Sequence, residues 1–137
     1  MKTFSDGFVY LGQWKKGTDV YQGRGTQITD NGEIHEGYWE NGELNGKGRM
    51  IFPNGEMYLG FHKSHQKEGK GVFSWPDGQR YEGEYVKGKR EGTGILFYSG
   101  GGKYEGEWSD GQKHGPGVMT DAEGNAQAGE WLLGTQI

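Results

Sequence analysis

Hydrophobic and polar residues alternate in short stretches that recur along the whole chain. The stretch YEGEW near the C-terminus places Tyr104, Gly106 and Trp108 on one side of an extended chain. Glu105 and Glu107 fall on the opposite side. A two-residue alternation of this kind is typical of a β-strand, so each such stretch predicts one strand with an aromatic face and an acidic face.

A second, apolar alternation follows each of these strands. It places three pairs of residues on one face: Met50 with Phe52, Phe73 with Trp75, and Leu96 with Tyr98. Pro-Asn-Gly and Pro-Asp-Gly close two of these stretches. Both are strong turn signals, because proline presets the first turn position and glycine accepts positive φ. Each unit is therefore predicted to be a β-hairpin, and consecutive hairpins are expected to join into one antiparallel sheet.

One glycine of the unit recurs at a nearly constant interval. It stands at Gly12, Gly37, Gly60, Gly83, Gly106 and Gly129, so the step is 25 residues once and 23 residues four times. The first step is longer because GTDVYQGRG has two more residues than the equivalent GELNGKG. An interval this regular predicts a repeat array.

The array is predicted to occupy residues 1–137 as a single domain. It would comprise an N-terminal half-repeat, five hairpin units and a C-terminal half-repeat, which is about twelve strands. Phe4 aligns with Phe52 of a later unit, whereas Gln127 and Ala128 stand where the other units have Tyr and Glu. With strands ~4.8 Å apart, an elongated single-layer sheet of this kind is roughly 50 Å long, and it is expected to twist.

Composition supports a thin all-β structure. Apolar residues make up 31% of the chain, which is too little for a thick two-layered core, yet aromatic residues reach 14% and glycine occurs 29 times. Aromatic content at this level argues against disorder. The net charge is −4 with no basic cluster, so nucleic-acid binding is not expected. The absence of cysteine excludes disulfides and thiolate metal sites.

The unit resembles the MORN repeat (membrane occupation and recognition nexus), whose pattern is similar to YEGEW-x-x-G-x-x-x-G-x-G followed by a D-G turn. Residues 81–94, YEGEYVKGKREGTG, and residues 104–117, YEGEWSDGQKHGPG, match it almost position for position. The resemblance covers essentially the whole chain. It implies hairpin repeats and an interaction role, since similar proteins are components of cilia, cytoskeletal scaffolds and junctions.

Two histidines depart from the repeat. The Trp position holds Trp14, Trp39, His62, Tyr85, Trp108 and Trp131, so His62 interrupts the aromatic run. His65 replaces the loop glycine that stands at Gly42, Gly88 and Gly111, which predicts a differently shaped loop in that hairpin.

The acidic pairs and the histidines are candidate chemical sites. Glu82 with Glu84, and Glu105 with Glu107, could form an acid–base pair, but a stripe that recurs every 23 residues cannot mark one active centre. A solvated face with Glu opposite Lys or Arg is predicted instead, and no catalytic residue is expected. Four histidines could suggest zinc, namely His35, His62, His65 and His114. Their spacing lacks a second ligand pair, so neither metal nor cofactor is expected. The Gly-x-Gly doublets fit no phosphate-binding loop.

The aromatic stripe is the predicted binding surface. A one-layer sheet leaves apolar surface open, which usually marks an interaction site. A concave groove is predicted, which accepts a helix or an extended segment of a partner protein. Its predicted contact residues are Trp14, Trp39, Tyr58, Tyr81, Tyr85, Tyr104 and Trp108. The open sheet ends also allow pairing between copies of the chain.

The functional prediction is a non-catalytic scaffold subunit of a larger assembly, such as a ciliary or cytoskeletal complex inside the cell. The alternative is an adaptor that associates with phospholipid membranes, which the family name implies. The basic residues argue against it, because the densest stretch, VKGKREG, has only three. An enzymatic activity could belong only to a partner, since the array leaves no room for a catalytic domain.

Overall fold

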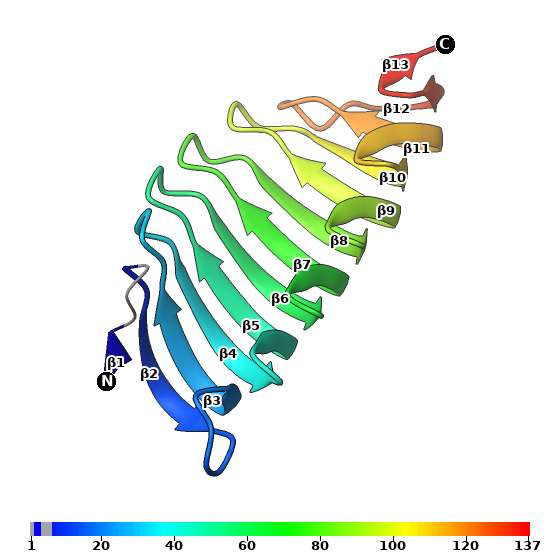
Figure 1. Cartoon of the computed structure of the whole chain (residues 1–137). Helices are drawn as coiled ribbons and strands as arrows, with labels where there is room; N and C mark the ends of the chain where they lie inside the picture. Colours follow the sequence, from blue (N-terminus) through cyan, green and yellow to red (C-terminus); the bar gives the residue numbers. More distant parts are fainter. Residues whose placement is uncertain (1, 4–6) are drawn as a thin grey trace.

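The protein forms one open antiparallel β-sheet in a computed structural model that describes residues 2–3 and 7–137. Within these residues thirteen strands follow one another across the sheet in chain order. Figure 1 shows an elongated, twisted single layer with β1 and β13 at opposite ends. The strands are β1 (Lys2–Thr3), β2 (Val9–Trp14), β3 (Tyr21–Ile28), β4 (Ile34–Glu40), β5 (Glu43–Ile51), β6 (Met57–Lys63), β7 (Gln66–Ser74), β8 (Arg80–Val86), β9 (Lys89–Phe97), β10 (Lys103–Ser109), β11 (Gln112–Thr120), β12 (Ala126–Leu132) and β13 (Thr135–Gln136).

This arrangement confirms the predicted fold class. The hairpins join through neighbouring strands only, as expected for units that each pack against the next. The first and last strands are only two residues long. Phe4, which was aligned with later aromatic residues, lies outside the described residues.

A row of glycines crosses eleven consecutive strands, from β2 to β12. Each is paired with the next: Gly12, Gly25, Gly37, Gly48, Gly60, Gly71, Gly83, Gly94, Gly106, Gly117 and Gly129. A tyrosine ring lies against this row in most hairpins. A Cβ atom added at Gly94 would stand 2.5 Å from Cε2 of Tyr81, so the position has no room for a larger residue. Glycine is therefore required here for close approach of a ring to the backbone.

Every hairpin bends directly after this glycine row. The pairing register shifts between the glycine and the Trp position in each of the five hairpins, as between Gly106 and Trp108. One residue of the first strand, Glu107, faces the three residues 114–116 of the second, so the bulge adds two residues to the second strand and bends it. Gly115 lies within this bulge and has a φ of 82°, which glycine adopts without strain. The bend turns the loop ends of the hairpins over the aromatic face.

The core lies on one face of the sheet only. Its buried apolar side chains are Tyr10, Tyr21, Trp39, Leu44, Met50, Tyr58, Tyr81, Tyr85, Leu96, Tyr104, Trp108 and Trp131. Neighbouring rings meet mostly edge to face; the centroids of Tyr81 and Trp108, for example, are 5.2 Å apart. Edge-to-face pairs stabilise by roughly 0.5–1.5 kcal/mol beyond their area burial, so a thin sheet can be held by ring contacts.

The hairpin loop at His65 keeps the shape of the others, which corrects the expectation from sequence. His65 adopts a φ of 67°, close to the 84° of Gly42 in the equivalent loop. The N–H of His65 donates to the carbonyl oxygen of Leu44 at 2.9 Å. Gly88 and Gly111 make the same bond in their loops. The inter-hairpin hydrogen bond therefore decides the loop conformation, and histidine accepts the left-handed backbone that it requires.

Candidate functional site

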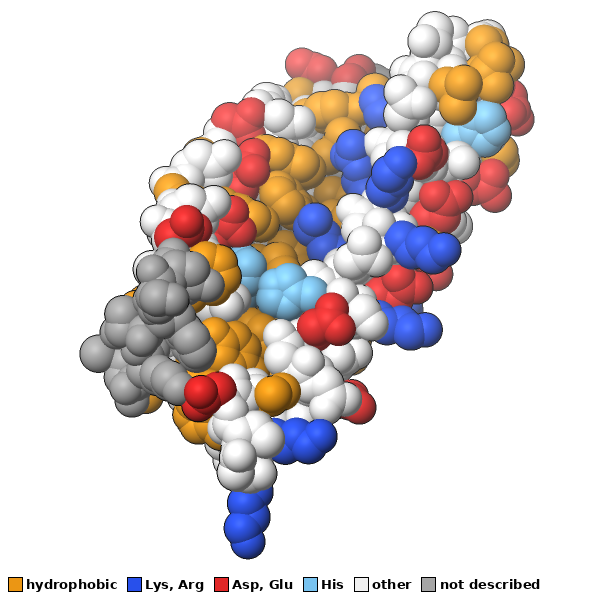
Figure 2. Space-filling model, in the orientation of Figure 1, with side chains coloured by type: hydrophobic (Ala, Val, Ile, Leu, Met, Phe, Trp, Pro, Cys, Tyr) orange, Lys and Arg blue, Asp and Glu red, His pale blue; other side chains and the backbone are white. Residues whose placement is uncertain are grey.

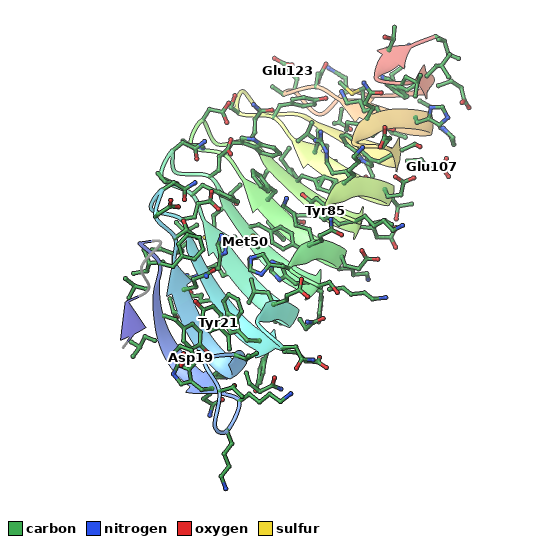
Figure 3. All side chains as sticks on the ribbon, in the orientation of Figure 1. Asp19, Tyr21, Met50, Tyr85, Glu107 and Glu123 are labelled. Carbon is green, nitrogen blue, oxygen red and sulfur yellow. The ribbon has the colours of Figure 1, made fainter. Side chains whose placement is uncertain are left out.

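The aromatic face is hollowed along the long axis of the sheet. Figure 2 shows hydrophobic side chains along the bottom of this hollow, with histidine near its middle. Figure 3 shows Tyr21, Met50 and Tyr85 over the sheet on this face, whereas Glu123 projects at its margin. The hollow therefore has an apolar floor and polar edges.

The residues predicted to contact a partner form the floor of the hollow. Six of them are at most 4% exposed, namely Trp39, Tyr58, Tyr81, Tyr85, Tyr104 and Trp108, and Trp14 is half-buried. The hydroxyl of Tyr81 donates to the carbonyl oxygen of Glu84 at 3.0 Å, and Nε1 of Trp108 donates to that of Gly94 at 3.1 Å. Burial raises the pKa of Tyr81 to about 12. The structure thus assigns these residues to the core, and their contact with a partner stays a prediction.

Other apolar side chains line the accessible part of the hollow. They pack against the core but remain partly exposed: Trp14, Phe52, Phe73, Trp75, Tyr98 and Met119. The sequence predicted that Phe73 and Trp75 share one face of their strand, as they do here. They offer more surface to a partner than the buried rings do.

A row of three cations stands over the rings. Lys67, Arg90 and Lys113 occupy the position opposite the Trp position in successive hairpins. Nζ of Lys67 lies 5.7 Å from the ring centroid of Tyr58, Cζ of Arg90 lies 4.7 Å from that of Trp108, and Nζ of Lys113 lies 5.2 Å from that of Tyr104. These distances are within the range of cation–π attraction. We call these three residues the cation row.

The cation row lacks carboxylate partners within the described part of the chain. Arg90 donates from Nη2 to the carbonyl oxygen of Gly111 at 2.7 Å, and Lys113 donates to the hydroxyl of Tyr98. None of the three forms an ion pair with a described residue. Burial lowers the pKa of Lys67, although the charge of Glu56 opposes this. The row is therefore a set of half-buried positive charges held by rings and neutral oxygens.

Sequence analysis missed the cation row. The sequence does indicate the row, because a basic residue recurs at the repeat interval at positions 67, 90 and 113. The bend after the glycine row, which turns these side chains over the aromatic rings, was not visible in the alternation of the sequence.

Three histidines meet near the middle of the hollow. The N–H of Leu44 donates to Nδ1 of His65 at 3.2 Å, so Nε2 of His65 carries the hydrogen of the neutral ring. This Nε2–H then points to Nδ1 of His35 at 3.1 Å. Nε2 of His35 in turn donates to Oε1 of Glu33 at 2.9 Å. The result is a directional hydrogen-bonded chain that crosses two hairpins.

His62 is buried beside this chain without a partner for either ring nitrogen. It is 4% exposed and contacts the ring of Tyr58 edge to face at 5.0 Å. Burial lowers its pKa to about 4, and the positive charges of His65 and Lys67 act in the same direction. His62 is therefore a neutral core ring. Within the described residues, no group of three or more His, Cys, Asp or Glu side chains could hold a metal ion.

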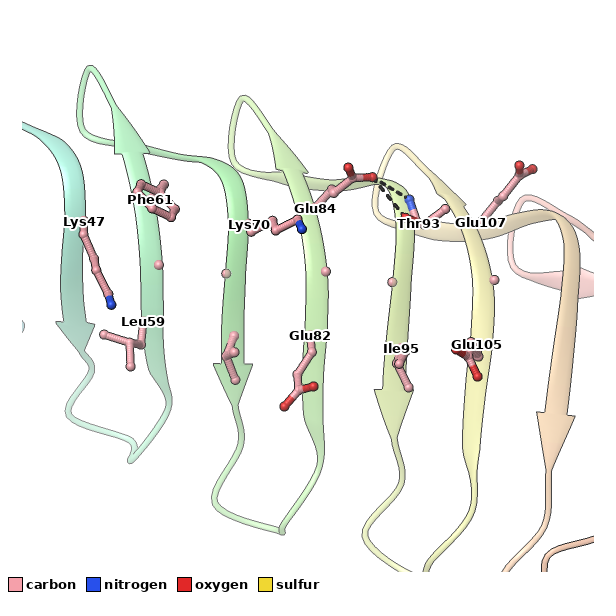
Figure 4. Close-up of a pocket in the computed structure, with 16 residues that line it drawn as sticks. Lys47, Leu59, Phe61, Lys70, Glu82, Glu84, Thr93, Ile95, Glu105 and Glu107 are labelled. Atoms are coloured by element: carbon pink, nitrogen blue, oxygen red, sulfur yellow. Dashed lines mark hydrogen bonds between the residues drawn. The ribbon is translucent and has the colours of Figure 1, made fainter.

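The opposite face of the sheet, which we call the outer face, also carries a groove. It has a volume of about 900 Å³ and follows the glycine row from β5 to β10. In Figure 4, Leu59, Glu82, Ile95 and Glu105 lie along one side of the glycines, and Lys47, Phe61, Lys70, Glu84, Thr93 and Glu107 lie along the other. The two acidic pairs, Glu82 with Glu84 and Glu105 with Glu107, therefore line this outer groove. Glu84 accepts hydrogen bonds from the N–H and hydroxyl of Thr93, and both Glu105 and Glu107 are exposed as predicted.

The outer face is less polar than predicted. Val9, Ile28, Ile34, Ile51 and Met57 pair in sequence across five strands. The expected cross-strand ion pairs are few, with Glu36 and Arg49 as a clear example. The alternation did signal this apolar row, since all five residues stand in phase with the outward positions. His114, the fourth histidine, accepts the N–H of Leu133 through Nδ1 at 3.3 Å, which is a loop contact.

Comparison with known families agrees with the pattern of these hairpins. The MORN repeat profile matches residues 35–57, 63–80, 81–103 and 104–126, which is more than half of the chain. The chain belongs to the MORN repeat family. This family is a non-catalytic type of repeat. No match is found among curated proteins.

The MORN sheet is also similar to solved structures. Among them is the SAS-4 (dCPAP) TCP domain of Drosophila melanogaster, solved in complex with a proline-rich motif of Ana2 (dSTIL). The identity is 12%, the match covers 87% of this chain and 89% of that chain, and the TM-score is 0.28. A likeness at this TM-score carries no weight for function. Within the described residues, no helix could span a membrane.

Proposed function

We propose that this MORN chain is a non-catalytic scaffold subunit that holds an α-helix of another protein along its hollow. The observation that carries the proposal is the hollow itself, with its apolar floor, its partly exposed rings and its cation row. Convergence of exposed apolar surface in one concave site is typical of a docking surface.

A helix suits this hollow better than an extended segment does. The hollow runs across the strands, whose backbone groups pair with their neighbours in the sheet. An extended segment lying across them would leave its own N–H and C=O groups unpaired. A helix satisfies these groups internally and presents one apolar face to the floor.

The assembly that the chain would join is proposed to be a ciliary or cytoskeletal complex in the cytoplasm. The sheet ends at β1 and β13 are proposed to allow end-to-end pairing of copies as well. Light scattering checks the second point: a concentration-independent monomer would argue against pairing. The alternative, association with phospholipid membranes, has support only from the three residues of the cation row.

Cross-linking mass spectrometry after affinity purification of the full chain tests docking in the hollow. Native lysines mark each face, because Lys67 and Lys113 lie in the hollow whereas Lys47 and Lys70 line the outer groove. We expect partner cross-links at Lys67 and Lys113. Cross-links confined to Lys47 and Lys70 would reject the hollow as the docking site.

A pair of matched variants complements this experiment. Phe52→Glu with Trp75→Glu adds charge to the hollow, and Leu59→Glu with Phe61→Glu adds the same charge to the outer face. All four side chains are accessible at least in part. We expect the first variant to lose the partner and the second to keep it. Equal retention by both would contradict the proposal.

A further inference from the structure

The cation row repeats with the geometry of the sheet. Lys67, Arg90 and Lys113 lie on β7, β9 and β11, which are separated by one strand each. Two strand spacings amount to about 9.5 Å, so the row offers positive charge at roughly that interval along the hollow. One side of an α-helix repeats every seven residues, or about 10.5 Å. Three acidic residues at heptad spacing would therefore each face one cation.

The same position carries no charge in the first two hairpins. Tyr21 and Leu44 stand opposite Trp14 and Trp39, where later hairpins have a cation. Both belong to the apolar core. A helix seated along the hollow would thus meet positive charge over β7 to β11, and apolar side chains together with the His35–His65 pair over β3 to β5. This asymmetry determines which end of a bound helix lies over β7 to β11 and which end lies over β3 to β5.

Charge also differs between the two sides of the hollow. The turns that join successive hairpins carry the exposed acidic residues Asp30, Asp77 and Asp121. Figure 2 shows acidic side chains along that margin, and Lys and Arg interspersed with Asp and Glu on the opposite side. An acidic row on the partner is therefore repelled by these turns and attracted by the cation row, which favours one rotational setting of the helix.

The three cations are preorganised to bind an anionic partner. Each is half-buried, so part of its hydration is lost. Rings and neutral oxygens hold the three heads in place, which limits the side-chain entropy lost when a carboxylate binds.

We infer that the partner is an amphipathic helix with a row of Asp or Glu at heptad spacing, which pairs with Lys67, Arg90 and Lys113. This inference rests on the proposed function and specifies its ligand. It also assigns the apolar end of the helix to the half of the hollow between β3 and β5.

A series of synthetic helical peptides tests the inference on the full chain. All members share one apolar face, and the heptad row is Glu in the first, Gln in the second and Lys in the third. A fourth has the composition of the first with its Glu residues moved off the row. We expect the Glu peptide to bind roughly thirtyfold more tightly than the Gln peptide, about threefold for each pair. The displaced-Glu peptide should bind like the Gln peptide, and the Lys peptide should bind least.

The peptide affinities distinguish a failure of the acidic row from a failure of helix docking. Equal affinity for the Glu and Gln peptides would overturn the inference but leave helix docking intact. A lack of binding by every peptide would overturn both. On the native chain, the advantage of the Glu peptide should shrink as salt rises from about 50 to about 500 mM. An advantage that does not respond to salt would also reject the inference.

Matched variants locate the effect on the chain. Lys67→Met, Arg90→Met and Lys113→Met together keep cover over the rings while removing the charges. Arg24→Met, Lys47→Met and Lys70→Met together remove the same charge from the outer face. We expect only the first triple variant to reduce the Glu peptide to the affinity of the Gln peptide, with the affinity for the Gln peptide unchanged.

Phosphatidylserine vesicles serve as the competing ligand in the same experiment. We expect no vesicle binding that depends on the cation row. Binding of vesicles that is lost in the first triple variant, and that the Glu peptide fails to displace, would overturn the inference in favour of a lipid surface.

Discussion

Two parts of the sheet bury different rings at the Trp position. They are the regular repeats between β8 and β11 and the histidine segment between β4 and β7. In the regular repeats Tyr81 and Trp108 are buried, and each donates a hydrogen bond to a backbone carbonyl. In the histidine segment the Trp position holds His62, whose nitrogens have no partner. The imidazole of His62 therefore fills the ring position but lacks the hydrogen bond that a tryptophan makes there.

Repeats of equal length therefore differ in how their cores are packed. The regular repeats are closely packed against the glycine row, whereas the histidine segment is less closely packed at Gly48, beside His62, and has a titratable core. A Cβ atom at Gly94 would meet the ring of Tyr81 at 2.5 Å. A Cβ atom at Gly48 would meet Nδ1 of His62 at 3.2 Å and the carbonyl oxygen of Glu36 at 2.9 Å. The two segments should therefore respond differently to the same substitution.

The largest effect is expected from Gly94→Ala in the regular repeats. The new methyl group has no space beside the ring of Tyr81, so overpacking should lower the free energy of unfolding by about 3 kcal/mol. Gly48→Ala is the matched change in the histidine segment and should cost about 1 kcal/mol. Urea denaturation of both variants measures the difference. Equal losses would show that the two segments are packed alike.

Acid should destabilise the histidine segment through His62. Burial lowers its pKa in the folded state to about 4, below the unfolded value of about 6.5, so the neutral ring stabilises the fold. This contribution is complete above about pH 6.5 and is lost as the pH falls toward 4. Burial lowers the pKa of His65 as well, so its neutral form also stabilises the fold and this contribution is lost as the pH falls below about 6.5. The total loss from His62 should be on the order of 2–3 kcal/mol, measured by denaturation at several pH values.

His62→Trp serves as the control for this pH dependence. Nε1 of Trp39 and of Trp108 donates to the carbonyl oxygen of the glycine fourteen residues earlier, so a Trp at residue 62 should donate to that of Gly48. The variant should therefore lose most of the acid sensitivity. A pH profile identical to that of the unmodified chain would exclude His62 as its source.

A smaller effect is expected from Tyr81→Phe in the regular repeats. The change removes one hydrogen bond to the carbonyl oxygen of Glu84 and keeps the ring, so the loss should be about 1 kcal/mol. Tyr38→Phe, on the exposed outer face, is the matched control and should change stability by less than about 0.5 kcal/mol. Thermal melts of both variants test this, and a larger loss in the control would contradict the assignment of the core to the aromatic face.

The smallest effect is expected from His65→Gly, which restores the loop residue of the other hairpins. Glycine relieves the left-handed backbone strain of His65, while the bonds to Leu44 and His35 are lost. These opposing terms are each about 1 kcal/mol, so the net change should be near zero. The imidazole nitrogen chemical shifts of His35 give the sharper result. The Nδ1 resonance of His35 should move once the hydrogen bond from His65 is gone, and an unchanged resonance would argue against the histidine chain.

Much of the fold was predictable because its determinants are local. The alternation in YEGEW assigned Tyr104 and Trp108 to one face and Glu105 to the other, and the turn signals set the hairpins. The site was less predictable. The aromatic residues chosen as contacts proved to be core, because the bend of each strand covers them. The cation row went unrecognised for the same reason, since its position over the rings depends on that bend.

The sequence by itself determined the repeat interval, the positions of the turns and the faces of the strands that alternate like YEGEW, because these depend on backbone preferences within one hairpin. Only the tertiary structure decided what neighbouring hairpins do to one another. It aligned the glycine row, brought His35 and His65 together across 30 residues, and placed Arg90 over Trp108. These contacts join separate repeats, so their geometry depends on the twist and bend of the assembled sheet.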